Sequence, residues 1–199
     1  RSGMLMIEGG TSGSFSVTSD SVTIKGAAVK SSFVGIFRTL AGSIGAQTDD
    51  DYILVKVPLG TGIELQGTAT ADTIIGSIGG SLVVNTSGSG DVQAKSVSRL
   101  RVSRVGSGDT IVDHVDGDVI ISNSGSGDTK IAAGRIGTLQ VQITGSGGAV
   151  IDCTAQFANL SLTGSGKIRV TRVINEPVRH CTGSGSIMVK HIGEPNTSR

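Results

Sequence analysis

The sequence predicts an all-β fold, a single-stranded parallel β-helix (β-solenoid) with coils of about 19 residues. The first observation is a repeat: Gly-Ser-Gly starts 18 to 20 residues apart at Gly88, Gly106, Gly125, Gly145, Gly164 and Gly183. The second is that apolar and polar residues alternate on both sides of each tripeptide. The third is composition, because 37% of the 199 residues are hydrophobic but only 3% are aromatic, so the core has to be aliphatic.

Each repeat is predicted to supply two strands. In the strand after the tripeptide, the fifth and seventh residues from its first glycine point inward, as in Thr110 and Val112, whereas the sixth, Ile111, points outward. The strand before each tripeptide is predicted to bury the pairs Leu82/Val84, Leu100/Val102, Val119/Ile121, Leu139/Val141 and Leu160/Leu162. One such unit cannot bury its apolar side alone, so the coils stack with equivalent strands in parallel.

The two ends of the repeat are less regular. A degenerate copy, Gly67-Thr68-Ala69, begins 21 residues before Gly88. At the other end, Pro177-Val178-Arg179 breaks the alternation, which predicts a distorted last coil. Unpaired strand edges at the ends of a solenoid invite pairing with another chain. We therefore expect any homo-oligomer to form through the solenoid ends, around Ile187–Lys190.

The sequence before the repeat predicts a cap. We divide the chain into residues 1–49, an N-terminal cap with the first strands, and residues 50–199, the parallel β-solenoid. Alternation predicts strands at 14–18, 21–25 and 52–58. Apolar residues at helical spacing predict a short amphipathic helix over 33–44, which would cover the exposed apolar end of the stack.

Composition excludes several function classes. The net charge is only +1, and four Phe and one Tyr are too few to build stacking platforms, so we expect no nucleic-acid partner. No apolar run is long enough to be a transmembrane segment. The chain begins with Arg1 rather than Met. We expect an exported protein, periplasmic or at the cell surface, whose signal is not visible in this chain.

Three aspartates are the candidate metal ligands. Asp91, Asp109 and Asp128 each follow a Gly-Ser-Gly, and stacking would bring their carboxylates within range of a hard cation such as Ca²⁺. The column continues as Gly148, Lys167 and Ser186, so the charge is not maintained. We therefore favour aspartates that bond to the backbone of their own turns, with no metal and no cofactor.

Catalytic arrangements are weakly indicated. Paired aspartates could serve a glycoside hydrolase, but no long insertion between coils would form a cleft. The three histidines occupy unrelated positions in their repeats, which argues against a metal cluster. Cys153 and Cys181 fall at different points of the coil, which argues against a disulfide. Cys181 next to His180 is more simply interpreted as a core thiol beside a surface imidazole than as a reactive pair.

A basic run could attract an anion. It consists of Lys95, Arg99, Arg101 and Arg104. The following coil offers Asp113, Asp116 and Asp118. Because opposite charges on neighbouring strands attract, pairing between these two coils is the favoured interpretation.

The repeated phrase Ser-Gly-Ser-Gly-Asp-Val/Thr, as at Ser87–Val92 and Ser124–Thr129, resembles the bacterial putative auto-transporter adhesins of the head-GIN-domain type. The entry strand Ile53–Pro58 is similar to the way those repeats begin. The resemblance covers about residues 52–192 and implies a pectin-lyase-like β-helix without catalytic residues, acting in cell adhesion. The family's Gly-Ile-Asn run is missing, and Val173-Ile174-Asn175 matches it only in part.

Two hypotheses about function follow. The first is a non-enzymatic surface or periplasmic β-solenoid, an adhesin or assembly scaffold that presents flat faces to a protein or a surface polysaccharide. The alternative is a carbohydrate-active β-helix enzyme that uses a pair of the aspartates. An acid-lined groove would favour the enzyme, and smooth faces would favour the scaffold.

Overall fold

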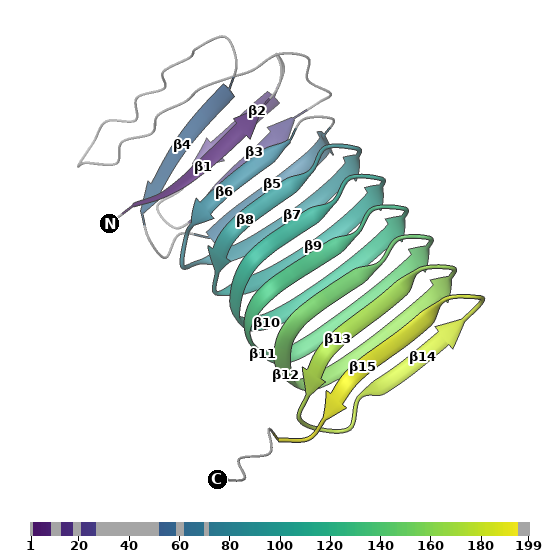
Figure 1. Ribbon diagram of the computed structural model, residues 1–199. Helices are drawn as coiled ribbons and strands as arrows, with labels where there is room; N and C mark the ends of the chain where they lie inside the picture. The colour runs from purple at the N-terminus through teal and green to yellow at the C-terminus, as the bar shows by residue number, and fades with distance from the viewer. Residues whose placement is uncertain are drawn as a thin grey trace.

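Successive coils lie side by side and form a β-solenoid of about seven turns, with coils about 19 residues apart (Figure 1). This computed structural model describes residues 2–8, 13–17, 21–26, 52–58, 62–69 and 72–194. The predicted fold class is confirmed, and these residues contain strands and turns but no helix. The helix predicted over 33–44 and the predicted boundary between residues 49 and 50 lie outside the described residues.

Two columns of strands make up the solenoid. The first column holds the strands that follow each turn: β6 (Thr73–Ser77), β8 (Val92–Val97), β13 (Lys167–Val173) and β15 (Ser186–Ile192). The second column holds those that precede it: β5 (Gly62–Ala69), β7 (Ser81–Gly88), β9 (Arg99–Gly106) and β14 (Val178–Thr182). Three long strands run through both columns: β10 (Thr110–Gly125), β11 (Thr129–Gly145) and β12 (Ala149–Gly164). Neighbouring strands within each column are parallel.

The N-terminal end of the stack uses antiparallel strands. In the first column, β1 (Ser2–Glu8) pairs antiparallel with β6 on one side and with β4 (Tyr52–Pro58) on the other. In the second column, β3 (Ser21–Gly26) joins β5 in parallel and β2 (Gly13–Val17) pairs antiparallel with β3. The strands predicted at 14–18, 21–25 and 52–58 are confirmed to within one residue at their ends.

The repeated Gly-Ser-Gly closes the corner between the two columns. Its first glycine has a positive φ in each copy, for example +136° at Gly106. A Cβ on Gly106 would lie 2.2 Å from the carbonyl oxygen of Gly88 in the preceding coil. That oxygen accepts hydrogen bonds from the N–H groups of Ser107, at 3.1 Å, and Gly108, at 3.4 Å. Only glycine permits both this φ and this approach, so the corner fixes how one coil sits on the next.

The core is a stack of aliphatic side chains between the two columns. The fifth and seventh residues after each turn, and the pairs predicted before each turn, are buried in every coil up to Val170. In the last coil, Ile187 and Val189 are half-buried against the core. The predicted inward positions are therefore confirmed. No buried residue of the described chain is aromatic, and Phe157 lies at a corner with 55% of its surface exposed.

The structure corrects the register of the degenerate copy. Ala69 pairs with Gly88, and Gly67 pairs with Thr86. The predicted alignment of Gly67 with Gly88 is therefore wrong, because the first coil also keeps a spacing of 19 residues from Ala69 to Gly88. At the other end, every residue of β14 is exposed, and the strand pairs with β12 without a shift of register, so the predicted distortion of the last coil does not extend to this pairing.

The buried and exposed faces of β10 give a first prediction. Val112 has no exposed surface, whereas the adjacent Ile111 is half-buried on the outward side. Val112→Asp should lower the free energy of unfolding by about 4 kcal/mol or more, because it buries a charge without a partner. Ile111→Asp should cost about 1 kcal/mol, since its carboxylate reaches water. Urea denaturation of both variants measures the difference, and equal losses would contradict the inward assignment.

The glycine corner gives a second prediction. Gly106→Ala should destabilise the chain by about 3 kcal/mol or more, because its Cβ would collide with a backbone oxygen that cannot move alone. Gly193→Ala is the matched control: φ is +99°, but nothing lies within 4 Å of the added Cβ. Only the conformational cost remains there, about 1 kcal/mol. Equal shifts in the thermal midpoint would show that the stacking of corners carries no stability.

Candidate functional site

A ladder of carboxylates runs along the turn corner, where the first column begins. Each Oδ1 accepts a hydrogen bond from the backbone N–H one coil further on: Asp91 from Asp109 at 2.8 Å, Asp109 from Asp128 at 2.8 Å, and Asp128 from Gly148 at 2.7 Å. Asp72 extends the ladder by accepting from the N–H of Asp91 at 2.8 Å. The expectation that these aspartates bond to their own turns is wrong, because their oxygens bind the next coil.

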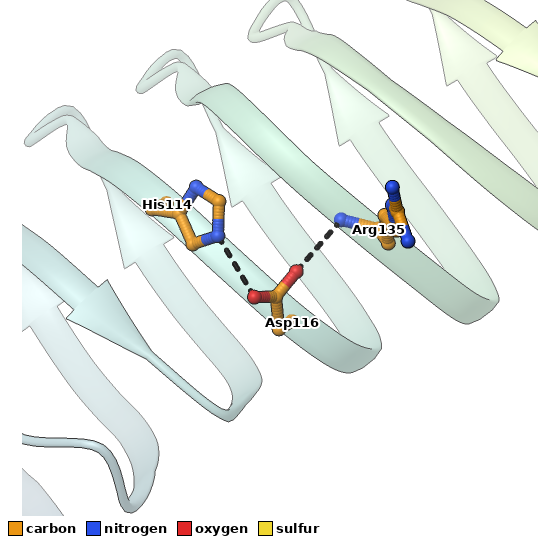
Figure 2. Close-up of polar contacts among 3 residues, drawn as sticks. All are labelled: His114, Asp116 and Arg135. Carbon is orange, nitrogen blue, oxygen red and sulfur yellow. Dashed lines mark hydrogen bonds and ion pairs between the residues drawn. The ribbon is translucent and has the colours of Figure 1, made fainter.

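A second set of carboxylates joins the coils at the opposite corner (Figure 2). Asp116 Oδ1 accepts from the N–H of Arg135 at 3.1 Å, and Asp118 Oδ1 accepts from the N–H of Thr138 at 2.9 Å. The other oxygen of Asp116, Oδ2, lies 2.9 Å from Nε2 of His114. The hydrogen bond from His114, followed by that from Arg135, holds the pKa of Asp116 below its usual value. Asp116 is therefore ionised at neutral pH, and both carboxylates hold the next coil through its backbone.

Arg104 is buried beneath the turn corner, with only 4% of its surface exposed. Its Nη1 donates to the carbonyl oxygen of Asp109 at 2.8 Å and to Thr110 Oγ1 at 3.2 Å, and its Nη2 donates to the carbonyl oxygen of Gly90 at 2.5 Å. Burial lowers the pKa of Arg104, and the negative charges of Asp91 and Asp109 oppose this shift. This cation joins two turns from inside and is not available to a ligand.

The other cations of the predicted basic run do not pair with the following coil. Lys95, Arg99 and Arg101 are exposed, and the ion pairs of the described residues involve neither them nor Asp118. The predicted pairing between the two coils is therefore wrong. Its physical reason is competition, since Asp116 and Asp118 bind backbone N–H groups that would otherwise lack a partner at the corner.

The two cysteines are both free and lie in different surroundings. Cys153 is buried in β12, and its burial, more than the nearby charge of Asp152, raises the pKa of the thiol to about 11. It is therefore protonated at neutral pH and is not a nucleophile. Cys181 is exposed on β14 and donates towards the carbonyl oxygen of Gly185 at 3.5 Å, so its partner is not the adjacent His180. The core position predicted for the Cys181 thiol is wrong.

No metal centre is formed by the part of the chain that the structure describes. Within it, no three side chains of His, Cys, Asp or Glu lie close enough to hold a metal ion. The candidate ligands Asp91, Asp109 and Asp128 form a row along the solenoid, in which one oxygen of each carboxylate already binds a backbone N–H group. The described residues also contain no helix that could cross a membrane.

One side of the solenoid carries no charged side chain over three consecutive coils. We call it the uncharged face; it consists of the outward residues of the second column from Ile120 in β10 to Thr163 in β12, and the exposed Arg101 of β9, which pairs with Ile120, borders it. The residues of the face are Ile120, Ser122, Ser124, Gln140, Gln142, Thr144, Asn159, Ser161 and Thr163. All are exposed except Ile120 and Ser161, which are half-buried. Neighbouring strands lie about 4.8 Å apart, so the face is a regular grid of hydroxyl and amide groups.

The opposite side of the same coils is charged. The outward residues of the first column include Asp109, Asp128, Lys130, Asp152 and Arg169. The aspartates there bind the next coil, whereas the hydroxyl and amide groups of the uncharged face have no hydrogen-bond partner among the described residues. Uncharged hydroxyl and amide groups without a partner among the described residues therefore line this side over three consecutive coils.

The sequence interpretation missed this face because it concentrated on charged residues. A signal was present: once the inward positions are set, the residues between them in the second strand are Ser, Thr, Asn or Gln from Ser122 to Thr163. Polar residues without charge are common at strand surfaces, so only their alignment over several coils makes the pattern informative.

The fold and its surface define a class: a regular β-solenoid whose acids bind the backbone of the next coil and one side of which is uncharged over three coils. A family model for the putative auto-transporter adhesin, head GIN domain, matches residues 82–193, which is more than half of the chain. The chain belongs to this family, and the resemblance noted in the repeat phrase is confirmed. No curated protein and no solved structure matches the chain.

The carboxylate ladder gives a third prediction. Replacing Asp91, Asp109 and Asp128 by Asn should leave the unfolding free energy within about 1 kcal/mol of the original, because an amide oxygen accepts the same N–H. Replacing all three by Ala should cost about 0.5–1 kcal/mol for each bond removed. Added Ca²⁺ should leave the melting temperature unchanged. A rise with Ca²⁺ that is lost in the Asn variant would establish a metal site instead.

Proposed function

We propose that the protein is a non-enzymatic, exported adhesin scaffold that binds a neutral polysaccharide at the cell surface through its uncharged face. The observation that carries the proposal is the segregation of charge: the first column presents Asp, Lys and Arg, whereas the uncharged face, from Ile120 to Thr163 in the coils of β10 to β12, presents none. Membership of a family described as auto-transporter adhesins supports export and surface display.

The chemistry of the face selects the class of ligand. An anionic polymer would be held by cations, and a basic protein by carboxylates, but the centre of this face offers neither. Its Ser and Thr hydroxyls and its Gln and Asn amides both donate and accept hydrogen bonds. A polymer with many hydroxyls and no charge can exchange its bonds to water for bonds to these groups.

Binding on such a surface has to be distributed over many contacts. A hydrogen bond exposed to solvent contributes only about 1 kcal/mol net, and no aromatic residue of the uncharged face can stack on a sugar ring. Affinity must therefore be summed over several coils and several sugar units. A long polymer lying across the strands satisfies this condition better than a small sugar.

The positions of the acids favour a scaffold over an enzyme. A glycoside hydrolase needs one carboxyl group with a raised pKa that donates a proton and a second that attacks or activates water. Here the pKa of Asp116 is lowered, and the carboxylates of Asp91, Asp109 and Asp128 accept backbone N–H groups. These acids stabilise the stack of coils.

Affinity electrophoresis in gels containing a soluble neutral polysaccharide provides the fourth prediction. The unaltered chain should be retarded by a neutral glucan or mannan and not by an anionic polymer such as alginate. Ser122→Glu combined with Gln142→Glu should reduce the retardation at least about threefold, because both charges would be desolvated beneath a neutral ligand. Added salt should leave the retardation unchanged.

The matched control is Gln93→Glu, which places the same new charge on an exposed glutamine of the first column. Its retardation should equal that of the unaltered chain. Equal weakening by Gln93→Glu and by the Ser122/Gln142 variant would remove the uncharged face from the proposal. Retardation by alginate alone would assign the binding to cations, and shortened polysaccharide chains after incubation would identify an enzyme.

A further inference from the structure

Among the residues that the structure describes, no strand lies over the C-terminal coil, which we call the open end. β14 pairs with β12 and β15 pairs with β13, so each has a strand neighbour on one side among the described residues (Figure 1). The backbone N–H and C=O groups on the outer edges of these strands have no strand partner there. Unpaired edges of this kind bind other strands unless bulges, prolines or many charges block them.

The side chains of β15 match those of the interior, whereas β14 aligns Arg179 with the buried Leu160. Ile187, Val189 and Ile192 are aligned with Ile168, Val170 and Val173, which are all buried. In the last coil the same positions are uncovered: Ile187 and Val189 are half-buried, and Ile192 is 45% exposed. β15 therefore presents the apolar pattern of an interior strand without a further strand over it among the described residues.

The outward side of the open end is also apolar and weakly protected. Met188 on β15 and Val178 on β14 are 56% and 63% exposed. Neither strand contains a proline, and each contains one lysine or arginine and no acidic residue, Lys190 in β15 and Arg179 in β14. The opposite end of the solenoid presents different edges, the antiparallel strands β4 and β2.

We propose that the C-terminal coil binds the C-terminal coil of a second copy of this chain, related by a two-fold axis. The two copies of β15 then pair antiparallel, centred on Val189, so that all seven residues of the strand are paired. Met188 of each copy lies opposite Lys190 of the other, and no two lysines face each other. A two-fold contact is self-complementary and closes after two copies, whereas a contact between opposite ends would continue into filaments.

Analytical ultracentrifugation of the 199-residue chain, over about a hundredfold range of concentration, provides the fifth prediction. The unaltered chain should form a dimer. Met188→Lys places two lysines opposite each other twice in each dimer, and should raise the dissociation constant at least about tenfold. The matched control is Val105→Lys, since Val105 is 60% exposed but lies in the middle of the stack. It should dimerise like the unaltered chain.

Disulfide trapping tests the register. In a background with Cys181→Ser, Val189→Cys should form covalent dimers on oxidation, because position 189 lies opposite itself. Ile187→Cys, equally half-buried, should not, because it lies opposite His191 of the other copy. Any of four results would overturn the proposal. They are a monomer at all concentrations, equal dimerisation of Met188→Lys and Val105→Lys, trapping through position 187 rather than 189, and filaments that grow with concentration. Circular dichroism of every variant confirms that it is folded.

Discussion

The close approach of stacked glycine corners is the constraint on which the rest of the structure depends. The carbonyl oxygen of Gly88 accepts two N–H groups from the next coil and leaves no room for a Cβ on Gly106. This contact repeats at each turn, so each coil has one register relative to its neighbours. A slip of one residue would turn every buried side chain outward. The aliphatic core and the composition of both faces follow from it.

The carboxylates show how this register distributes chemistry. At a corner, backbone N–H groups point along the stack and need acceptors, and Asp109 and Asp116 supply them from the neighbouring coil. The buried guanidinium of Arg104 has the complementary role, because it donates hydrogen bonds to carbonyl oxygens of two turns from the interior of the solenoid. These charged groups therefore hold the coils together. The side chains of the uncharged face take no part in the hydrogen bonds between the described coils, which is why the proposed function assigns the ligand to them.

The period, the strands and the inward residues could be predicted from the sequence, because Gly-Ser-Gly marks the phase of every coil. The alignment of Gly67 with Gly88 failed, because a degenerate copy without the full tripeptide does not mark its own corner. The burial of Arg104 could not be predicted, since residues at the equivalent position in other coils include Asn123 and Ile143. Nor does spacing reveal which backbone N–H a carboxylate binds, as Asp128 shows.

The geometry of the two-fold axis connects the proposed dimer with the proposed binding of a polysaccharide. If β15 pairs with β15 of a second copy, the two-fold axis is perpendicular to the long axis of the solenoid. Each column of one copy then continues into the same column of the other copy, so β14 lies next to β14. The uncharged faces of the two copies then lie on the same side and form one longer grid. Because each hydrogen bond from such a grid contributes little, doubling the number of coils is an effective way to raise affinity for a polymer. The open end and the uncharged face would thus serve the same function.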